Sequence, residues 1–342
     1  MELSARKRAV LAAIIRTYIE TGEPVGSKIL TGLLENAPSS ATLRNEMSEL
    51  CSLGLLTQPH TSAGRVPTSR GFSLYVNSLM KPKNIDECTK RYIDDMLANG
   101  GCELEKLPEF AGNALSELTG LPAISCFTVD SGVTVRKVGL VRVSSRSGLL
   151  YLITSDGRVK SRICNIPEDF ESLQGIFEKI VSERIKRKPL QDMNRAGLQN
   201  VIAAIGLDAF ELMPIITSIF EMAADAERST VNLSGFAGLY RICGEDNARR
   251  IIELVERREP MLRVLEASGS QQGVIFGSDT LLRELYGTAL VVSEYRIGNR
   301  KGGRIGIIGP ARMSYEQIIP SIEYTANRLS QLMTDAGKDM ED

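Results

Sequence analysis

The chain has 342 residues, with 41 Lys and Arg against 42 Asp and Glu, and it contains a single His. This length suffices for two or three domains with cores of their own, and the net charge of −1 excludes a protein that is basic over its whole surface. One His excludes a zinc site built on several His ligands and any His-dependent triad that does not use His60.

The first 80 residues predict three helices and two short extended pieces. Apolar spacing places one helix between a capping Ser4 and Gly22, a second from near Ser27, and a third from Ser39 or Ser40 to Leu53. Leu55–Gln58 and Arg65–Val66 then read as extended segments joined by a turn, and a further helix covers 69–80. This order is typical of a winged helix-turn-helix, whose last helix of the three enters the DNA major groove.

The third helix has two faces. One face carries an apolar stripe made of Leu43, Met47 and Leu50. The other face carries small and polar residues, namely Ala41, Arg44, Asn45 and Ser48. Arg can bind guanine and Asn can bind adenine through two hydrogen bonds each. The free backbone N–H groups and the dipole at a helix start favour a phosphate, which makes Ser39, Ser40 and Thr42 candidates. On spacing alone, a core helix with a solvated outer side explains the pattern equally well.

The loop after the third helix has the composition of a wing. It is short and polar, its turn is set by Pro59 and Gly64, and its candidate DNA contacts are His60, Thr61, Ser62 and Arg65. Residues 1–82 hold nine Lys or Arg against six Glu, a modest excess of positive charge. We expect double-stranded DNA as the partner of this segment.

The rest of the chain predicts a mixed α and β arrangement. Helices are expected at Asp86–Ala98 and Leu107–Thr119, then strands at 123–129, 135–143, 149–154 and 159–166, with a type I′ hairpin turn at Asp156-Gly157 and a helix over 167–188. Residues 189–270 read as helical, strands return at 273–276, 289–295 and 304–308, and a helix closes the chain at 315–333. The fold class is therefore α+β, with one domain interrupted by a helical insertion.

Other candidate sites favour plain structural interpretations. The glycines from Gly303 to Gly309 lack the G-x-G-x-x-G spacing of a dinucleotide site and suit a strand with a tight turn. The basic run 184–188 suits a helix C-terminus. We expect no catalytic residue, no cofactor and no metal site. Scattered Cys and the lack of a long apolar run predict a cytoplasmic protein without a membrane span.

Three motifs carry a resemblance to a known family. They are Gly22–Lys28, Ser39–Met47 and Gly54–Thr68, which together closely resemble HrcA, the bacterial heat-inducible transcription repressor family. The run Gly306–Tyr315 resembles that family's C-terminal signature, so the likeness spans nearly the whole chain. The sequence departs from the family pattern at 273–280 and near 243–245, outside the DNA-binding motifs.

The resemblance implies a dimeric repressor of chaperone operons of the groE and dnaK type, which binds an inverted-repeat operator called CIRCE. It implies a winged-helix domain at 1–82, a connector at 83–104, a GAF-like domain at 105–188 and 272–338, and an inserted helical dimerisation domain at 189–271. It also implies regulation by a GroEL-type chaperonin, which keeps the repressor competent to bind DNA.

A second hypothesis keeps the DNA-binding domain but changes the switch. GAF-like folds often bind small molecules, so a metabolite held in that domain is the alternative to a chaperonin. An enzyme is the least favoured class, because the chain offers one loop His and no paired-carboxylate motif.

Overall fold

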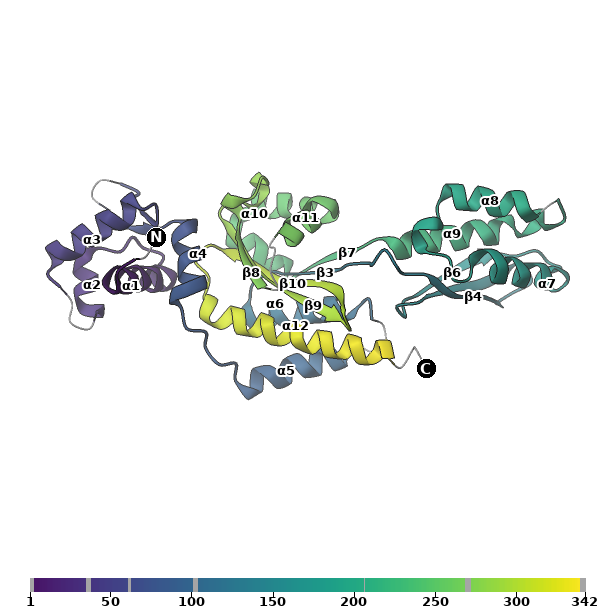
Figure 1. Ribbon diagram of the computed structural model, residues 1–342, viewed down its shortest axis with the longest axis horizontal. Helices are drawn as coiled ribbons and strands as arrows, with labels where there is room; N and C mark the ends of the chain where they lie inside the picture. The colour runs from purple at the N-terminus through teal and green to yellow at the C-terminus, as the bar shows by residue number, and fades with distance from the viewer. Residues whose placement is uncertain are drawn as a thin grey trace.

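The computed structural model describes residues 3–34, 38–60, 63–100, 104–205, 207–267 and 272–338. Figure 1 shows an elongated α+β chain with three parts in a row. We call them the N-terminal unit (residues 3–80), the central body (83–127 and 230–338) and the insertion (128–229).

The N-terminal unit contains the three helices and the two-stranded ribbon that the sequence predicts. Its elements are α1 (Ala5–Thr21), α2 (Ser27–Leu33), α3 (Ser40–Ser52), β1 (Leu56–Thr57), β2 (Val66–Pro67), α4 (Ser69–Leu74) and the π-helical turn η1 (Tyr75–Leu79). Ser4 caps α1 by accepting a hydrogen bond from the Lys7 amide at 3.3 Å, and Gly22 ends it in the left-handed conformation with φ of 71°.

The central body is built on a five-stranded antiparallel sheet in the order β7-β3-β10-β9-β8. The strands are β3 (Ala123–Phe127), β7 (Thr230–Ser234), β8 (Gln272–Phe276), β9 (Thr288–Ile297) and β10 (Arg300–Pro310). One face packs on α6 (Leu107–Thr119) and α12 (Tyr315–Lys338), against which α5 (Glu87–Ala98) lies, and the other packs on α10 (Phe236–Glu256) and α11 (Glu259–Ala267) (Figure 1). Short 3-10 turns, η5 (Gly277–Asp279) and η6 (Arg283–Leu285), link β8 to β9.

The insertion has a separate three-stranded sheet and its own core. Its elements are β4 (Val135–Arg142), β5 (Ser147–Thr154), β6 (Val159–Asn165), α7 (Phe170–Ile180), the π-helical turn η2 (Val181–Ile185), η3 (Leu190–Asp192), α8 (Arg195–Ile205), η4 (Leu207–Leu212) and α9 (Met213–Glu227). The buried side chains between Val133 and Ala226 form one hydrophobic cluster distinct from those of the central body.

These packing units differ from the domain bounds expected from the sequence. The boundary expected at 189 falls inside the insertion, because β4–β6 pair only with one another and share a core with α9. Residues 230–267, expected in the helical insertion, return to the central body, because β7 pairs with β3 from Ala123↔Ser234 to Phe127↔Thr230. The connector expected at 83–104 contains α5, which buries Ile93 and Leu97 in the main core.

Two local expectations also change. The β5–β6 hairpin is present, but its turn is not type I′: Gly157 has a positive φ of 86°, whereas Asp156 does not. The helix expected over 167–188 ends earlier, since α7 gives way to the π-helical turn η2 and the chain then leaves at Arg187, whose φ is 66°.

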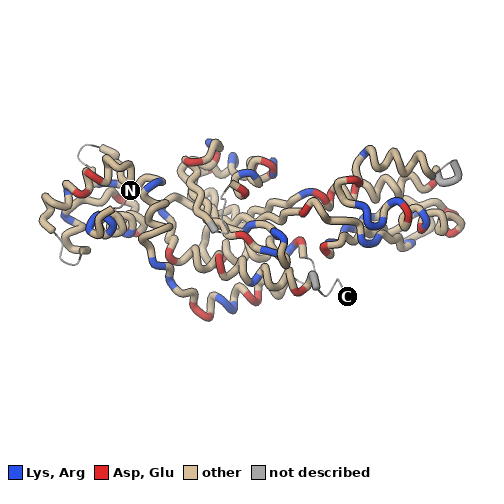
Figure 2. The backbone as a smooth tube through the Cα atoms, in the orientation of Figure 1, with Lys and Arg blue, Asp and Glu red and all other residues tan. Residues whose placement is uncertain are grey.

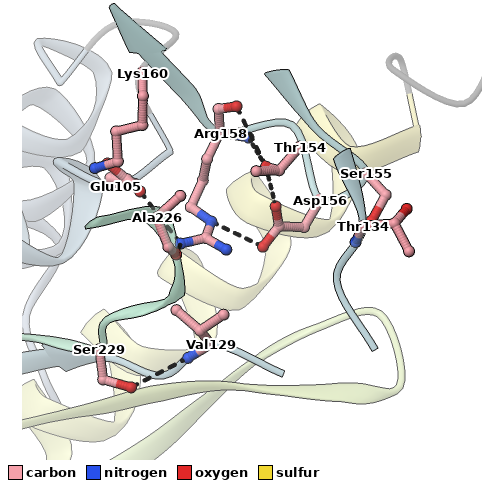
Figure 3. Close-up of polar contacts among 10 residues, drawn as sticks. All are labelled: Glu105, Val129, Thr134, Thr154, Ser155, Asp156, Arg158, Lys160, Ala226 and Ser229. Carbon is pink, nitrogen blue, oxygen red and sulfur yellow. Dashed lines mark hydrogen bonds and ion pairs between the residues drawn. The ribbon is translucent and has the colours of Figure 1, made fainter. Parts of the chain in front are cut away.

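A buried arginine joins the insertion to the central body. Figure 3 shows the Arg158 guanidinium between Asp156, Glu105 and the carbonyl of Ala226, with Lys160 beside Glu105. The Arg158 side chain is 1% exposed, and its Nε lies 2.9 Å from Asp156 Oδ2. Its guanidinium also lies over the ring of Phe127, 5.3 Å from the centroid, at the end of β3. These contacts hold the β5–β6 hairpin of the insertion against the central body, at the place where the chain passes from one part to the other and back.

Candidate nucleic-acid interface

Helix α3 has one buried and one exposed face, as its spacing predicts. Leu43, Met47 and Leu50 are buried, and the outward residues Ala41, Arg44, Asn45 and Ser48 are exposed. The Arg44 guanidinium forms no ion pair with any residue that the structure describes. Among the described residues it also has no hydrogen-bond partner, so none of them occupies its donors.

The acidic residues of α3 are turned toward α1 and meet cations there. Lys7 forms an ion pair with Glu49, and Arg6 Nη1 lies 4.0 Å from Glu46 Oε1. The hydrogen bond that Lys7 donates to the Glu49 carboxylate raises the pKa of Lys7 above its ordinary value. These pairs draw the two carboxylates toward α1 and so reduce the negative charge that α3 would otherwise present to a phosphate backbone.

Hydroxyl groups at the start of α3 already have local partners. Ser39 Oγ accepts a hydrogen bond from the Thr42 amide at 3.2 Å and lies 3.0 Å from Thr42 Oγ1. Ser40 Oγ lies 2.8 Å from Ser27 Oγ, which ties the start of α2 to the start of α3. Ser39 is exposed, while Ser40 and Thr42 are half-buried. The helix start is thus pre-ordered before any ligand binds.

The wing expected from the sequence corresponds to the loop of the β1–β2 ribbon. Leu56 pairs with Pro67 and Thr57 with Val66 in an antiparallel register. His60 is exposed and its carbonyl accepts a hydrogen bond from the Ala63 amide at 2.9 Å, while Thr61 and Ser62 lie outside the described residues. Arg65 is only half-buried, yet its Nε is enclosed and finds no hydrogen-bond partner among the residues that the structure describes.

One structural residue of this site was missed from the sequence. Val25 forms an isolated bridge to Arg65, so the segment before α2 adds a third strand-like piece to the ribbon. A Cβ on Gly64 would lie 2.5 Å from the carbonyl carbon of Val25, which explains the Gly at that position. The signal was present in Pro24-Val25-Gly26, a short extended segment between two helices.

The charged residues of the N-terminal unit favour recognition by particular side chains over attraction by a large uniform charge. Figure 2 shows Lys and Arg positions intermixed with Asp and Glu positions along the backbone of α1–α3. The arrangement supplies hydrogen-bond donors on one exposed helix face and a ribbon loop next to it, which is what reading base edges and touching a backbone require.

The described ranges contain neither a cluster of metal ligands nor a helix that could cross a membrane. Within them, no group of three or more His, Cys, Asp or Glu side chains is placed to hold a metal ion. None of the helices found among the described residues has the length and apolarity needed to cross a membrane.

Known proteins resemble this chain over nearly its full length. The family described as HrcA protein C terminal domain matches residues 105–319. The heat-inducible transcription repressor HrcA of Acetivibrio thermocellus is 29% identical and covers 97% of this chain and 96% of its own length. The repressor of the same name from Syntrophobacter fumaroxidans is 30% identical and covers 99% of each chain.

The fold has a counterpart among solved structures. A crystal structure described as a hypothetical protein covers 98% of this chain and 100% of its own, with a TM-score of 0.70 and 23% identity. The arrangement of elements described above is therefore shared along nearly the whole chain.

Proposed function

The chain belongs to the HrcA family, and from that premise we propose that it is a sequence-specific transcription repressor of heat-shock chaperone operons of the groE and dnaK type. It binds the CIRCE inverted repeat as a homodimer, with the N-terminal unit acting as a winged helix and the central body as a GAF-like domain. A GroEL-type chaperonin keeps it competent to bind.

The exposed face of α3 is the observation that carries this proposal. Arg44 and Asn45 are exposed opposite a buried apolar stripe, so both can reach base edges without disturbing the core. The residues proposed to contact DNA are Ser39, Ser40, Ala41, Thr42, Arg44, Asn45, Ser48, His60, Thr61, Ser62 and Arg65. Arg44 and Asn45 read bases, while the helix start and the wing hold phosphates.

The insertion supplies a surface suited to dimerisation. The register of its sheet puts Val141, Leu149 and Ile163 in one cross-strand row and Ile153 beside Val159 in another. Val141, Val159 and Ile163 are 54%, 59% and 59% exposed, and Figure 1 shows α8 and α9 on the opposite side of the sheet. Gly139, Tyr151 and Ser161 form the row between these two. A sheet face with two such apolar rows suits a self-complementary contact across a two-fold axis.

A two-fold dimer sets the form of the operator. Two copies of α3 related by a two-fold axis read an inverted repeat, with half-sites on one face of the duplex at roughly a multiple of 10–10.5 bp. The chaperonin then acts on the fraction of chains in this folded, dimeric state. When misfolded proteins occupy the chaperonin, fewer repressors remain active and the operons are expressed.

Fluorescence anisotropy with two duplexes tests the proposal. The CIRCE inverted repeat and a shuffled version of it are titrated at several salt concentrations, with and without GroEL-type chaperonin. Selective binding to the repeat, strengthened by chaperonin, is the expected result. Equal and steeply salt-dependent binding to both duplexes would reduce the interaction to phosphate attraction and contradict the proposal.

A pocket in the central body favours the metabolite-switched regulator as the second candidate. About 530 Å³ of space lies between the start of α5, the end of α6 and the first turns of α12. Leu121 and Ile318 supply apolar lining, but most of the lining side chains are polar or charged, among them Thr89, Arg312 and Gln317. Such a lining suits a polar metabolite better than an apolar one. A thermal-shift screen with cytosolic metabolites separates the two candidates, since a ligand at 100 times its Kd adds about 2.7 kcal/mol.

A further inference from the structure

The N-terminal unit and the central body share one hydrophobic core. Phe72 of α4 is 2% exposed and lies among three rings from other elements: Tyr18 of α1, Phe276 of β8 and Tyr315 of α12. The ring centroids are 6.3, 6.0 and 6.1 Å from that of Phe72. Because the buried residues of both parts form a single cluster, the N-terminal unit is docked on the body rather than tethered to it.

A polar contact at the edge of this core fixes its geometry. The Tyr75 hydroxyl donates a hydrogen bond to Glu316 Oε1 at 2.6 Å, and Arg16 Nε donates to the Tyr75 oxygen at 3.4 Å. Arg16 Nε also lies 3.5 Å from the same Glu316 oxygen. We call Arg16, Tyr75 and Glu316 the latch. Apolar contacts alone tolerate sliding, whereas these directional bonds specify one angle.

The latch connects the exposed face of α3 to the longest helix of the body. Arg16 lies on α1, which packs against α3 through buried side chains and the Lys7–Glu49 ion pair. Tyr75 begins the π-helical turn η1, and Glu316 lies in the first turn of α12. Just after the N-terminal unit, the Lys83 amide donates a hydrogen bond of 2.9 Å to the Glu316 carbonyl, which holds the first residue of the central body beside the same turn of α12.

We propose that Arg16, Tyr75 and Glu316 are positioning residues that fix the direction of α3 relative to the central body. The inference rests on the proposed function, because in a dimer this direction sets the separation of the two reading helices and hence the half-site spacing that the operator must have. Loosening the latch leaves each α3 able to bind its own half-site. It removes the advantage of binding two half-sites at once at one spacing.

Conservative variants isolate the latch from folding. Tyr75→Phe keeps the buried ring and removes only the hydroxyl, and Glu316→Gln keeps the shape and removes the charge. Tyr324→Phe is the matched control: its hydroxyl donates to Asp94 Oδ2 at 3.0 Å from the same helix, α12, but links it to α5 within the central body. Tyr75→Phe and Tyr324→Phe each remove one hydrogen bond between a Tyr and a carboxylate, and Glu316→Gln weakens one.

The first readout is binding to duplexes of different spacing. One carries a single half-site, one the complete inverted repeat, and the others the repeat with one to three base pairs added or removed. In the latch variants we expect half-site affinity to stay within about twofold, and affinity for the complete repeat to fall about tenfold, the size expected for one hydrogen bond to a charged group. In the latch variants, affinity for the duplexes with altered spacing should fall less than affinity for the complete repeat, so the preference for one spacing becomes weaker. The control Tyr324→Phe should keep the wild-type preference.

The second readout needs no DNA. Spin labels on clickable amino acids at positions 48 and 263 report the distance between α3 and the body, since Ser48 and Arg263 are both exposed. We expect a narrow distance distribution in the wild type and in Tyr324→Phe, and a broad one in both latch variants. Distributions that stay narrow in the latch variants, or half-site affinity that falls as much as affinity for the repeat, would overturn the inference. A wild type that does not prefer the repeat would instead contradict the proposed function, and broadened distances would still identify the latch.

Discussion

Val25 and Arg65 exchange two backbone hydrogen bonds, each 2.9 Å long, in which the amide of one residue donates to the carbonyl of the other. The pair joins the turn between α1 and α2 to the ribbon whose loop we propose as the wing. Since α2 is tied in turn to α3 through Ser27 and Ser40, the ribbon and α3 are held as one rigid element. Such rigidity lowers the entropy lost when both parts contact DNA together.

Gly64→Ala should break this element. A Cβ at position 64 would lie 2.5 Å from both the carbonyl carbon and the carbonyl oxygen of Val25, so backbone has to move. We expect the free energy of unfolding to fall by about 1–3 kcal/mol in guanidinium titrations, as for other overpacked sites. Gly32→Ala in α2 is the control, since its Cβ meets nothing within 4 Å and helix propensity should stabilise it by about 0.5–1 kcal/mol. Effects of the same sign at both positions would contradict the steric account.

Arg44→Ala should weaken binding to the operator by about 1–3 kcal/mol and relax its specificity. The physical reason is the loss of a bidentate contact to guanine from an exposed side chain that has no partner among the described residues. Anisotropy titrations with the operator and its shuffled version measure the change. Arg249→Ala is the control, because Arg249 is exposed and paired with Glu253 on α10, far from α3. Equal weakening on both duplexes would reassign Arg44 to a phosphate contact.

The sequence predicted the N-terminal unit well because its signals are local. Caps such as Ser4 and Ser39, the stop at Gly22 and the stripe from Leu43 to Leu50 act within one or two helical turns. The class of fold and most strands followed from alternation in the same way. The bounds of the insertion did not, because they depend on which strands pair: β7 is five residues long and reads as a strand of the body only once it lies beside β3.

The latch was equally out of reach of sequence reasoning. Tyr75 and Glu316 are 241 positions apart, and each has an ordinary local explanation, an aromatic position in a helix and an acidic residue in a first helical turn. Only the docking of α4 and η1 on α12 brings them together. Contacts between parts of a chain leave no periodic trace in a single sequence, whereas helix caps and amphipathic faces do.

Tyr75 should make stability depend on alkaline pH. Burial and the hydrogen bond to Glu316 raise the pKa of the Tyr75 phenol to about 12, from an ordinary value near 10. The unfolded chain therefore releases this proton first, and the stabilisation is complete below about pH 10 and is lost as the pH rises toward 12. Guanidinium titrations at several pH values should show a shallower decline in Tyr75→Phe than in the wild type. Phenolate absorbance that titrates fully near pH 10 in the native wild type would contradict this burial.

Ile163→Lys should separate the proposed dimer. Ile163 is 59% exposed on β6, an edge strand of the sheet, in one cross-strand row with Leu149 and Val141, so a charge there would cost little in the monomer and much in a buried contact. Sedimentation velocity should show a dimer for the wild type and a monomer for the variant, with circular dichroism unchanged. Ser172→Lys, at an exposed position on α7, should remain dimeric. A variant at position 163 that stays dimeric would move the interface to another surface.

Arg158→Met should destabilise the joint between the insertion and the central body more than any surface pair. The Asp156 carboxylate, whose side chain is 5% exposed, would lose its cation, and the Ala226 carbonyl would lose a donor. Removing one partner of a buried ion pair costs about 3–5 kcal/mol, because the other charge stays buried. Unfolding in guanidinium chloride gives this value, and limited proteolysis should show new cleavage near 128–134.

Arg162→Ala is the control. Arg162 pairs with Glu221 and Asp225 on the surface and its side chain is 39% exposed, so its loss should cost about 0–1 kcal/mol. Adding Asp156→Asn to Arg158→Met should recover part of the lost free energy of unfolding, because no unpaired charge then stays buried. A double variant no more stable than Arg158→Met would show that the Arg158 side chain acts through its packing on Phe127 instead.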